Sequence, residues 1–294
     1  MTYITKDASF TSSFRPTFCG LKFFDIVKQR KMKDSFSMRS GSSHGSKHKR
    51  LNMNNQDAHV SQTFSVPAWD KQFSVGLVAD GSTGNPIFSR TEVGSNLSVL
   101  YSYRRIQELI LSNVSVDHIP MVLYSSCTEF LWNLMNQIMP PGIVWDYPAK
   151  IKGRSNWTAQ TRFKVDYLAA TLLGFISDEE KIVTMTAGDG IVLVNGSINV
   201  IDQDDKPEYP VISINSPAKG FETRIYRKQD VHRLAIMSDG LKEPIDKIDG
   251  FVDAMFGYQH GNPLGIQAFL NNMADQYPEL FHDDATVITF ERGK

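Results

Sequence analysis

The sequence is poor in cysteine and has no long hydrophobic run, and each absence excludes a class of protein. Its two cysteines among 294 residues, Cys19 and Cys127, form no CxxC pair and no cluster with histidine, so the sequence predicts neither a zinc site nor a disulfide framework. We therefore expect a reducing compartment, the cytoplasm. No apolar stretch reaches the roughly 18 residues of a membrane-spanning helix. The N-terminus MTYITKDASF lacks the apolar core of a secretory signal.

Positive charge is concentrated at the start of the chain. Residues 1–50 hold eleven Lys and Arg against three Asp, a net charge of +8, whereas the whole chain carries −1 and the remaining residues therefore −9. A basic segment can bind nucleic acid or a membrane, but termini are commonly loose and solvated. Because no aromatic residues alternate with the basic ones in GSSHGSKHKR, the evidence for nucleic-acid binding is weak. We expect neither a nucleic-acid nor a membrane partner. Residues 1–40 are predicted to form a basic arm, and residues 41–294 a single domain.

Apolar patterning predicts strands and helices in separate blocks. Apolar runs bounded by turn residues predict strands at Phe73–Ala79, Lys181–Ala187, Ile191–Asn195, Ile198–Ile201, Leu234–Met237 and Thr286–Phe290. Helical spacing predicts helices at residues 91–113 and 264–277, while residues 127–138 and 165–176 fit a helix or a mixture. The Ser- and Gly-rich residues 37–56 are expected to form a loop. Because strands and helices do not alternate regularly, we expect an α+β fold in which helices cover antiparallel sheets.

Several apolar runs are flanked by carboxylates. VADG, AGDG and MSDG each end a run with Asp-Gly, and two Asp precede the run in HDDATVITF. A single Asp-Gly pair is most often a hairpin turn in which Gly takes a positive φ. Several together are harder to explain as turns, because a buried carboxylate is costly unless its charge is compensated. Too few basic residues flank these motifs to pair with all of them, so a metal cluster is predicted.

The ligand chemistry indicates a hard divalent cation. Carboxylate and carbonyl oxygens, with no Cys and little His, suit Mg²⁺ or Mn²⁺. Two such ions would be neutralised by the carboxylates of Asp57, Asp80, Asp239 and Asp283. Two neighbouring ions can share a water, lower its pKa and present hydroxide to a phosphorus atom.

The order of the motifs resembles the metal-dependent serine/threonine protein phosphatases of type 2C, and it is most similar to their shorter bacterial branch. The motifs are NNQDAH, VADGSTG, TEVGS, AGDG, IMSDGLKE and HDDATVITF, and the resemblance extends roughly from Gly41 to Phe290. Each motif is short, but six in the same order make the match specific. The resemblance implies a four-layer α-β-β-α sandwich, in which helices flank two antiparallel sheets.

The resemblance also implies roles for the residues of the first two motifs. Asp80 would bridge two metal ions, and the carbonyl of Gly81 would hold one of them. A strand that ends on Asp80 is explained if its tip is a metal ligand, since Gly lets the backbone turn so that its carbonyl also faces the ion. Asp57 would act through metal-bound water.

The later motifs supply the remaining ligands that the resemblance implies. Asp239 and Asp283 would hold the first ion, and Asp189 would join Asp239 at a third, weaker metal site. Asp284 stands where the family usually has Asn, so it is expected to lie behind the ligands. The sequence does not decide which of the two adjacent residues, Asp283 or Asp284, is the metal ligand.

The position after the first Asp-Gly pair departs from the family pattern. Many members have His there, where it protonates the leaving group, and this chain has Ser82. Serine is a poor general acid at neutral pH. Metal-bound water or a nearby histidine, with His59 as the candidate, is therefore expected to serve.

The phosphate-binding arginine of the family is also displaced. Its position is Asn52 in this chain, and Arg50, two residues earlier, is the candidate for this role. If Arg50 points to solvent, the phosphate would instead meet Arg39, Lys47 or His44.

Together these features predict a cytoplasmic signalling phosphatase. Hydroxide that bridges two Mn²⁺ or Mg²⁺ ions would hydrolyse phosphoserine or phosphothreonine in a protein substrate of a cognate kinase, without a covalent intermediate. The alternative is a catalytically weak relative that binds phosphoproteins, and Ser82 and the displaced arginine keep it open. A regulator whose basic arm binds nucleic acid is a third hypothesis. The sequence names neither the substrate nor the oligomeric state.

Overall fold

The computed structural model describes residues 35–82, 89–139, 158–203, 209–211 and 220–293. The chain divides into two compact units, Met1–Lys33 and Asp34–Lys294. All described residues belong to the second unit. Most of the predicted basic arm therefore lies outside the described residues.

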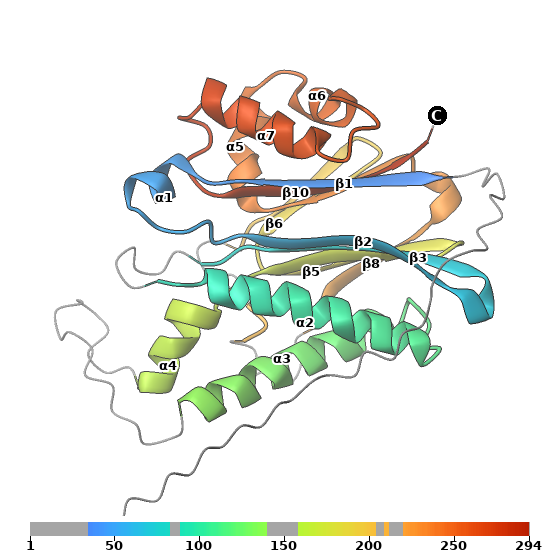
Figure 1. The fold of residues 1–294 in the computed structure, drawn as a ribbon, viewed down its shortest axis with the longest axis horizontal. Coiled ribbons are helices and arrows are strands. Elements are labelled where there is room, and N and C mark those ends of the chain that lie inside the picture. Colours follow the sequence, from blue (N-terminus) through green and yellow to red (C-terminus); the bar gives the residue numbers. More distant parts are fainter. Residues whose placement is uncertain (1–34, 83–88, 140–157, 204–208, 212–219, 294) are drawn as a thin grey trace, which may run out of the picture. The chain divides into compact units, whose positions relative to one another are not determined.

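Two antiparallel sheets form the centre of the second unit (Figure 1). The first sheet has the strand order β1 (Phe36–Ser43), β10 (Ala285–Arg292), β9 (Arg233–Met237), β6 (Gly190–Val194) and β7 (Ser197–Ile201). The second has the order β2 (Ala58–Val66), β3 (Lys71–Ala79), β4 (Leu172–Ser177), β5 (Lys181–Ala187) and β8 (Glu222–Arg227). Every pairing within the two sheets is antiparallel, as predicted.

Helices cover the outer face of each sheet (Figure 1). The first sheet is covered by α5 (Lys242–Lys247), α6 (Phe251–Gly257) and α7 (Gly265–Gln276), and the second by α2 (Glu92–Leu111) and α3 (Ile119–Ile138). The two remaining described α-helices are short, α1 (Ser46–Arg50) between β1 and β2, and α4 (Ala159–Phe163) before β4. The predicted four-layer α-β-β-α sandwich is confirmed. No helix in the described ranges is apolar over a length that could cross a bilayer.

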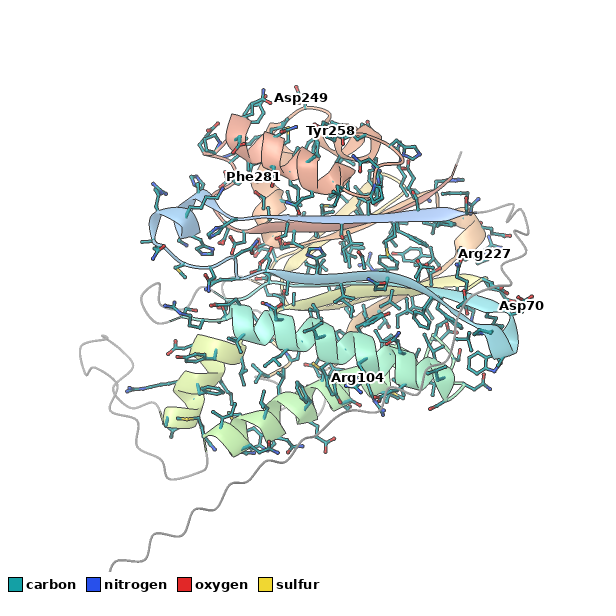
Figure 2. All side chains as sticks on the ribbon, viewed as in Figure 1. Asp70, Arg104, Arg227, Asp249, Tyr258 and Phe281 are labelled. Atoms are coloured by element: carbon teal, nitrogen blue, oxygen red, sulfur yellow. The ribbon has the colours of Figure 1, made fainter. Side chains whose placement is uncertain are left out.

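Three apolar cores hold the four layers together. The middle core lies between the sheets, where the rings of Phe175 and Phe290 pack with their centroids 5.1 Å apart. Another core lies between the second sheet and α2 and α3, and the third lies beneath α5, α6 and α7. Figure 2 shows side chains filling these spaces. Both faces of the central strands are thus packed, which fixes the positions of the ends of these strands.

The predicted elements are present. The six predicted strands are β3, β5, β6, β7, β9 and β10, and the two predicted helices are α2 and α7. Residues 127–138 belong to α3, which extends further toward the N-terminus. Residues 165–176 are mixed, because a helical turn continues to Leu168 and strand β4 begins at Leu172.

The prediction of a loop at residues 37–56 is wrong over much of its length. Strand β1 pairs with β10 along its whole length, and it begins at Phe36, inside the segment predicted as the arm. Gly41 makes this possible, since a Cβ there would lie 2.8 Å from the backbone of Gln267 on α7. A polar, Gly-containing strand is therefore buried by the close approach of α7, which the local pattern does not reveal.

Candidate metal centre

Carboxylates gather at one end of the sandwich, where four strands begin or end. Asp80 follows β3, Asp189 follows β5, Asp239 follows β9, and Asp283 precedes β10. Antiparallel pairing brings these ends together, because the end of β9 lies beside the start of β10, and the end of β5 beside the start of β4. The carboxyl of Asp80 is repelled by those of Asp57, Asp239 and Asp283. The structure thus brings the predicted metal-binding carboxylates together.

Asp80 is held at the tip of β3 by Thr171, the residue before β4. The backbone N–H of Asp80 donates to Thr171 Oγ1 at 3.0 Å, and the Asp80 carbonyl accepts from the Thr171 N–H at 2.8 Å. Burial, followed by repulsion from Asp57 and Asp239, raises the pKa of Asp80 well above its ordinary value. The Asp80 and Asp239 carboxyls also share a hydrogen bond. Such a pair needs either a proton or a cation between its oxygens.

Asp57 is buried at the entrance to β2, and only one of its carboxyl oxygens is satisfied. Oδ2 accepts a hydrogen bond from Ser238 Oγ at 2.7 Å. Oδ1 is buried and has no hydrogen-bond partner among the described residues. Burial, together with the charge of Asp284, raises the pKa of Asp57 to about 7. The unsatisfied oxygen marks a position where a further donor or a cation would be stabilising.

Gly81 lies where two chain segments come close to the tip of β3. A Cβ at this position would lie 2.6 Å from Thr91 Oγ1 and 2.9 Å from the Gln56 carbonyl oxygen. Any larger residue would push the loop outward. Glycine therefore allows the backbone next to Asp80 to stay close to the acidic cluster.

Asp189 lies at the edge of the cluster. Its Oδ1 accepts a hydrogen bond from the Gln203 N–H at 2.8 Å. Burial, and beyond it repulsion from Asp239 and Asp202, raises the pKa of Asp189. The ammonium of Lys242 is close, but it pairs with Asp202 at 2.6 Å. Asp189 and Asp239 therefore repel each other, and no described cation forms an ion pair with either of them.

Asp283 and Asp284 are neighbours in sequence but differ in their surroundings. Asp284 is buried, its Oδ1 accepts from the Gly45 N–H at 2.7 Å, and its Oδ2 accepts from the Gln56 N–H at 2.6 Å. His48 Nδ1 lies 2.8 Å from the same Oδ2. The Asp283 side chain is 43% exposed. Asp284 thus ties β10 to both ends of the segment containing α1, whereas Asp283 stays accessible to a ligand.

His48 lies between these two carboxylates. Its Nε2 is 3.5 Å from Asp283 Oδ1, and its side chain is 1% exposed. Burial lowers the pKa of His48, but the hydrogen bond and charge of Asp284 outweigh it and raise the pKa overall. The ligand atoms of His48, Asp283 and Asp284 are close enough to surround one ion. Because both Asp284 oxygens already accept N–H hydrogen bonds, we interpret His48 as a donor to the two carboxylates instead.

The acidic cluster has the chemistry of a site for hard divalent cations. No ion pair among the described residues involves Asp57, Asp80, Asp189 or Asp239. Burial and neighbouring carboxylates raise the pKa of Asp57, Asp80 and Asp189, so a bound cation would stabilise their charged forms. Oxygen donors of this kind suit Mg²⁺ or Mn²⁺. The residues present therefore fit such ions.

The predicted phosphate-binding residues lie in and before α1. Arg50 is exposed at the last residue of α1 and forms no ion pair with a described residue, and Lys47 is also exposed. Arg39 is buried beneath α6, where it donates to the Phe256 carbonyl at 2.8 Å. Arg39 is therefore committed to the fold, while Arg50 and Lys47 are free to meet a ligand.

His59 is separated from the carboxylates by the pleat of β2. It pairs with Val78 on β3 and so faces the core between the two sheets, whereas Ala58 faces α2. Burial lowers the pKa of His59, so its imidazole is neutral near pH 7. It makes no hydrogen bond with a described residue of the acidic cluster. The geometry gives no direct support to His59 as a proton donor.

Three residues near the carboxylates were missed by sequence reasoning. Ser238 orients Asp57, His48 contacts Asp283 and Asp284, and the Tyr209 hydroxyl shares a hydrogen bond with Ser82. Ser238 could have been found, because it directly precedes Asp239 in the SDG motif. The other two come from segments whose path the local sequence pattern does not define.

Comparisons with known proteins agree with the fold. A sequence model of the family described as protein phosphatase 2C matches residues 44–271. No curated protein sequence matches the chain. The serine/threonine phosphatase Stp1 from Staphylococcus aureus is similar in structure, with a TM-score of 0.54 and 14% identity over 88% of this chain and 96% of that one. PppA from Pseudomonas aeruginosa has a TM-score of 0.51 and 16% identity over 88% and 98%. The catalytic domain of PstP has a TM-score of 0.50 and 12% identity over 88% and 99%.

Proposed function

The chain belongs to the protein phosphatase 2C family, and we propose that it is a Mn²⁺- or Mg²⁺-dependent phosphatase acting on phosphoserine and phosphothreonine in proteins. The observation that carries the proposal is the group of carboxylates at the strand ends, of which Asp80, Asp189 and Asp239 form no ion pair with a described residue. PstP, a structural relative, was solved with two manganese ions. Its likeness to this chain supports the fold, and the acidic cluster supports the extension to metal binding.

We assign the metal ligands to the residues that meet at the strand ends. Asp80 and the Gly81 carbonyl would hold two ions, with Asp239 and Asp283 as further ligands. Asp189 and Asp239 would hold a third. Bound divalent ions lower the pKa of water and offset the charge of a phosphoryl group.

The protein's own groups orient the reactants around these ions. Asp57 is fixed by the hydroxyl of Ser238, and its free Oδ1 is placed to accept a hydrogen bond from a water molecule. Asp284 holds the start of β10 and the segment around α1 in register. Arg50, exposed on α1, is proposed to bind the phosphate, since a guanidinium matches phosphate with two parallel hydrogen bonds.

The domain organisation and the biological setting are parts of the same proposal. The phosphatase domain would comprise the predicted residues 41–294 together with the start of β1 at Phe36, and the residues before it would form the basic arm. We propose a cytoplasmic location and a partner kinase whose phosphoprotein products are the substrates. The exposed, basic α1 supports an anionic substrate near Asp283.

Phosphate release from a phosphoserine peptide tests the proposed function. We expect release with Mn²⁺ or Mg²⁺, none after EDTA treatment, and recovery when metal is restored. The matched control is Asp117→Asn, which removes a carboxylate far from the cluster. Saturable binding of the phosphopeptide without any release would favour a phosphoprotein-binding relative instead, and hydrolysis that survives EDTA would contradict the proposal.

A further inference from the structure

Strand β7 forms one edge of the first sheet, and no described strand pairs with its outer side. The turn Asn195–Gly196 joins it to β6, so Val194 and Ser197 form the first hydrogen-bonded pair. Hydrogen-bonded and non-bonded pairs alternate along two antiparallel strands. Ile198 and Val200 therefore turn their N–H and C=O groups away from β6. These groups are available to pair with a further strand.

The side chains of β7 make this edge apolar. Its sequence SINVI holds no charged residue and no proline, the residues that commonly keep an edge strand from pairing. Ile198 lies opposite Leu193 of β6, so it is on the face of the sheet that α5, α6 and α7 cover, and Val200 is on the same face. Both Ile198 and Val200 are nevertheless 41% exposed. The edge thus presents backbone hydrogen-bonding groups together with apolar side chains.

The opposite edge of the same sheet, β1, is covered by a side chain. The Ser42 N–H donates to Gln267 Oε1 at 3.0 Å, and the Ser42 carbonyl accepts from Gln267 Nε2 at 2.7 Å. An amide on α7 thus takes the place of a neighbouring strand. No described side chain forms such a hydrogen bond with Ile198 or Val200. Of the two edges, β7 is therefore the one that can still accept a partner strand.

The edge of the second sheet lies beside β7. Its last strand is β8, and Glu222 and Arg224 of β8 line a small cavity between the sheets together with Asn199 of β7. Glu222 and Arg224 lie on the same face of β8, where they pair at 3.0 Å. Asn199, at the middle of β7, is therefore level with Thr223, which lies between the two charged residues. One side of the sandwich thus consists of two adjacent strand edges.

We propose that this side of the sandwich is an interface between two copies of the chain, related by a two-fold axis that passes Asn199 and Thr223. Pairing β7 antiparallel with its own copy places Ile198 against Val200 of the partner subunit, on the same face of one continuous sheet. Ile198 then exchanges both of its backbone hydrogen bonds with Val200 of the partner subunit. Pairs of β-branched residues directly opposite each other stabilise neighbouring strands.

The same axis makes β8 complementary to its own copy. Antiparallel alignment about Thr223 places Glu222 opposite Arg224 of the partner subunit, and it does so twice by symmetry. Opposite charges across a strand pair are favourable, whereas like charges are unfavourable. The four charged groups therefore alternate in sign around the axis. An unrelated strand would not match this pattern, which favours a second copy of the chain as the occupant.

The interface lies beside the candidate metal centre without including it. β7 continues toward Gln203, whose N–H donates to Asp189 at 2.8 Å. No residue of β7 or β8 is assigned to metal or phosphate binding. Variants of the interface should therefore keep the activity of the chain, and the inference does not rest on the proposed phosphatase function.

Sedimentation equilibrium of the full chain tests the interface. We expect the mass of two chains at high concentration and that of one chain after dilution. Val200→Lys places a charge against Ile198 of the partner subunit, and it should raise the dissociation constant of the dimer by about tenfold or more. Val93→Lys on α2 is the matched control, because Val93 is equally exposed, at 41%, and lies on a different surface. The melting temperature of each variant shows whether the monomer stays folded.

A charge exchange on β8 tests the second half of the interface. Arg224→Glu places two carboxylates opposite each other on both sides of the axis, so it should weaken the dimer by about tenfold. The double variant Glu222→Arg, Arg224→Glu restores opposite charges across the axis, and the dimer should recover. A loss of stability within the monomer would not produce this recovery.

The outcomes decide the inference independently of the proposed activity. A dimer that weakens in Val200→Lys and Arg224→Glu, stays intact in Val93→Lys and recovers in the double variant supports it. A chain that stays monomeric at every concentration, a dimer that these variants leave unchanged, or a loss in Arg224→Glu without recovery would overturn it. Absence of phosphopeptide hydrolysis would overturn the proposed function and leave this interface standing.

Discussion

The charged side chains at the two ends of the same strands differ in whether they form ion pairs. β5 begins with Lys181, whose ammonium pairs with Asp117. At its other end, β5 leads to Asp189, which has no ion-pair partner among the described residues and whose pKa is raised mainly by burial. Opposite charges are therefore paired at the start of β5, whereas carboxylates lie close to one another beyond its last residue.

β9 repeats this contrast. Its first residue, Arg233, pairs with Glu291 at 3.0 Å. Asp239 lies two residues beyond its last residue, Met237, and forms no ion pair among the described side chains. Figure 2 places Arg227, which pairs with Asp230, at the end of the sheets away from α1. We name the two regions the paired end and the acidic end, the latter comprising Asp57, Asp80, Asp189, Asp239 and Asp283.

We interpret this difference as a division between a region that serves folding and a region that serves the proposed chemistry. Exposed ion pairs such as those at the paired end contribute little stability each, but they leave no charge uncompensated. Gathered carboxylates lower the stability of the metal-free fold, since each one disfavours the charge of its neighbours. An arrangement that opposes folding and persists in the structure is expected at a functional site.

The largest effect should come from neutralising a carboxylate at the acidic end. Asp80→Asn and Asp239→Asn should each lower kcat/KM for a phosphopeptide by about 10³-fold or more, because a metal ligand is lost. The same change at the paired end, Asp117→Asn, should leave the rate within about twofold. Phosphate release measured on all three purified variants checks the comparison. Near-normal turnover in Asp239→Asn would show that the ligand assignment is wrong.

Variants of Asp283 and Asp284, which precede β10, should distinguish a catalytic role from a structural one. Asp283→Asn should lower activity by about a hundredfold with little change in melting temperature, since its side chain is partly exposed. Asp284→Asn should instead lower the melting temperature by several degrees, because one oxygen that accepts N–H hydrogen bonds becomes an amide donor. Activity and thermal unfolding measured side by side decide the register. A larger loss of activity in Asp284→Asn, at equal stability, would reverse the assignment.

A smaller effect is expected at α1. Arg50→Ala should raise KM for a phosphopeptide about tenfold with unchanged Mn²⁺ affinity, which corresponds to one charge-assisted contact of roughly 1.5–3 kcal/mol. Lys49→Ala, the neighbouring exposed cation, is the matched control. Equal KM values for the two variants would indicate that Arg50 points to solvent. The phosphate contact would then be assigned to Lys47 or His44.

The smallest expected effect is a pH dependence of the metal-free fold. The pKa of Asp57 is raised from 3.8 to about 7, so the folded chain holds this proton more tightly than the unfolded chain does. Stability is therefore highest at low pH and falls as pH rises between these two values. Without metal, the melting temperature should drop by about 5 °C between pH 5 and pH 8. Asp57→Asn should reduce this drop, and an unchanged drop would show that other groups cause it.

Much of the fold could be predicted because most strands carry their own apolar signal. β4 was ambiguous, since the run LLGFIS is apolar throughout and follows a helical turn directly, so its pattern has no period. β1 and β8 are largely polar edge strands, and they exist because a neighbouring strand offers hydrogen bonds. Edge strands of this kind depend on tertiary pairing, which local patterning does not contain.

The candidate site likewise contains some residues that the sequence predicts and others that it does not. Asp80, Asp189, Asp239 and Asp283 could be predicted because each adjoins a recognisable strand end. The groups around Asp284 could not, since Gly45, Gln56 and His48 come from a segment with loop-like composition. Tyr209 is likewise placed by the packing of Val211 on α3, far away in sequence.

Calorimetric titration of the chain with Mn²⁺ tests the central claim most directly, that the acidic end is a metal centre. We expect at least two ions to bind per chain near neutral pH, Asp80→Asn to lose binding, and Asp117→Asn at the paired end to bind like the unmodified chain. Binding of no ion, or equal binding by Asp80→Asn and the unmodified chain, would contradict the account.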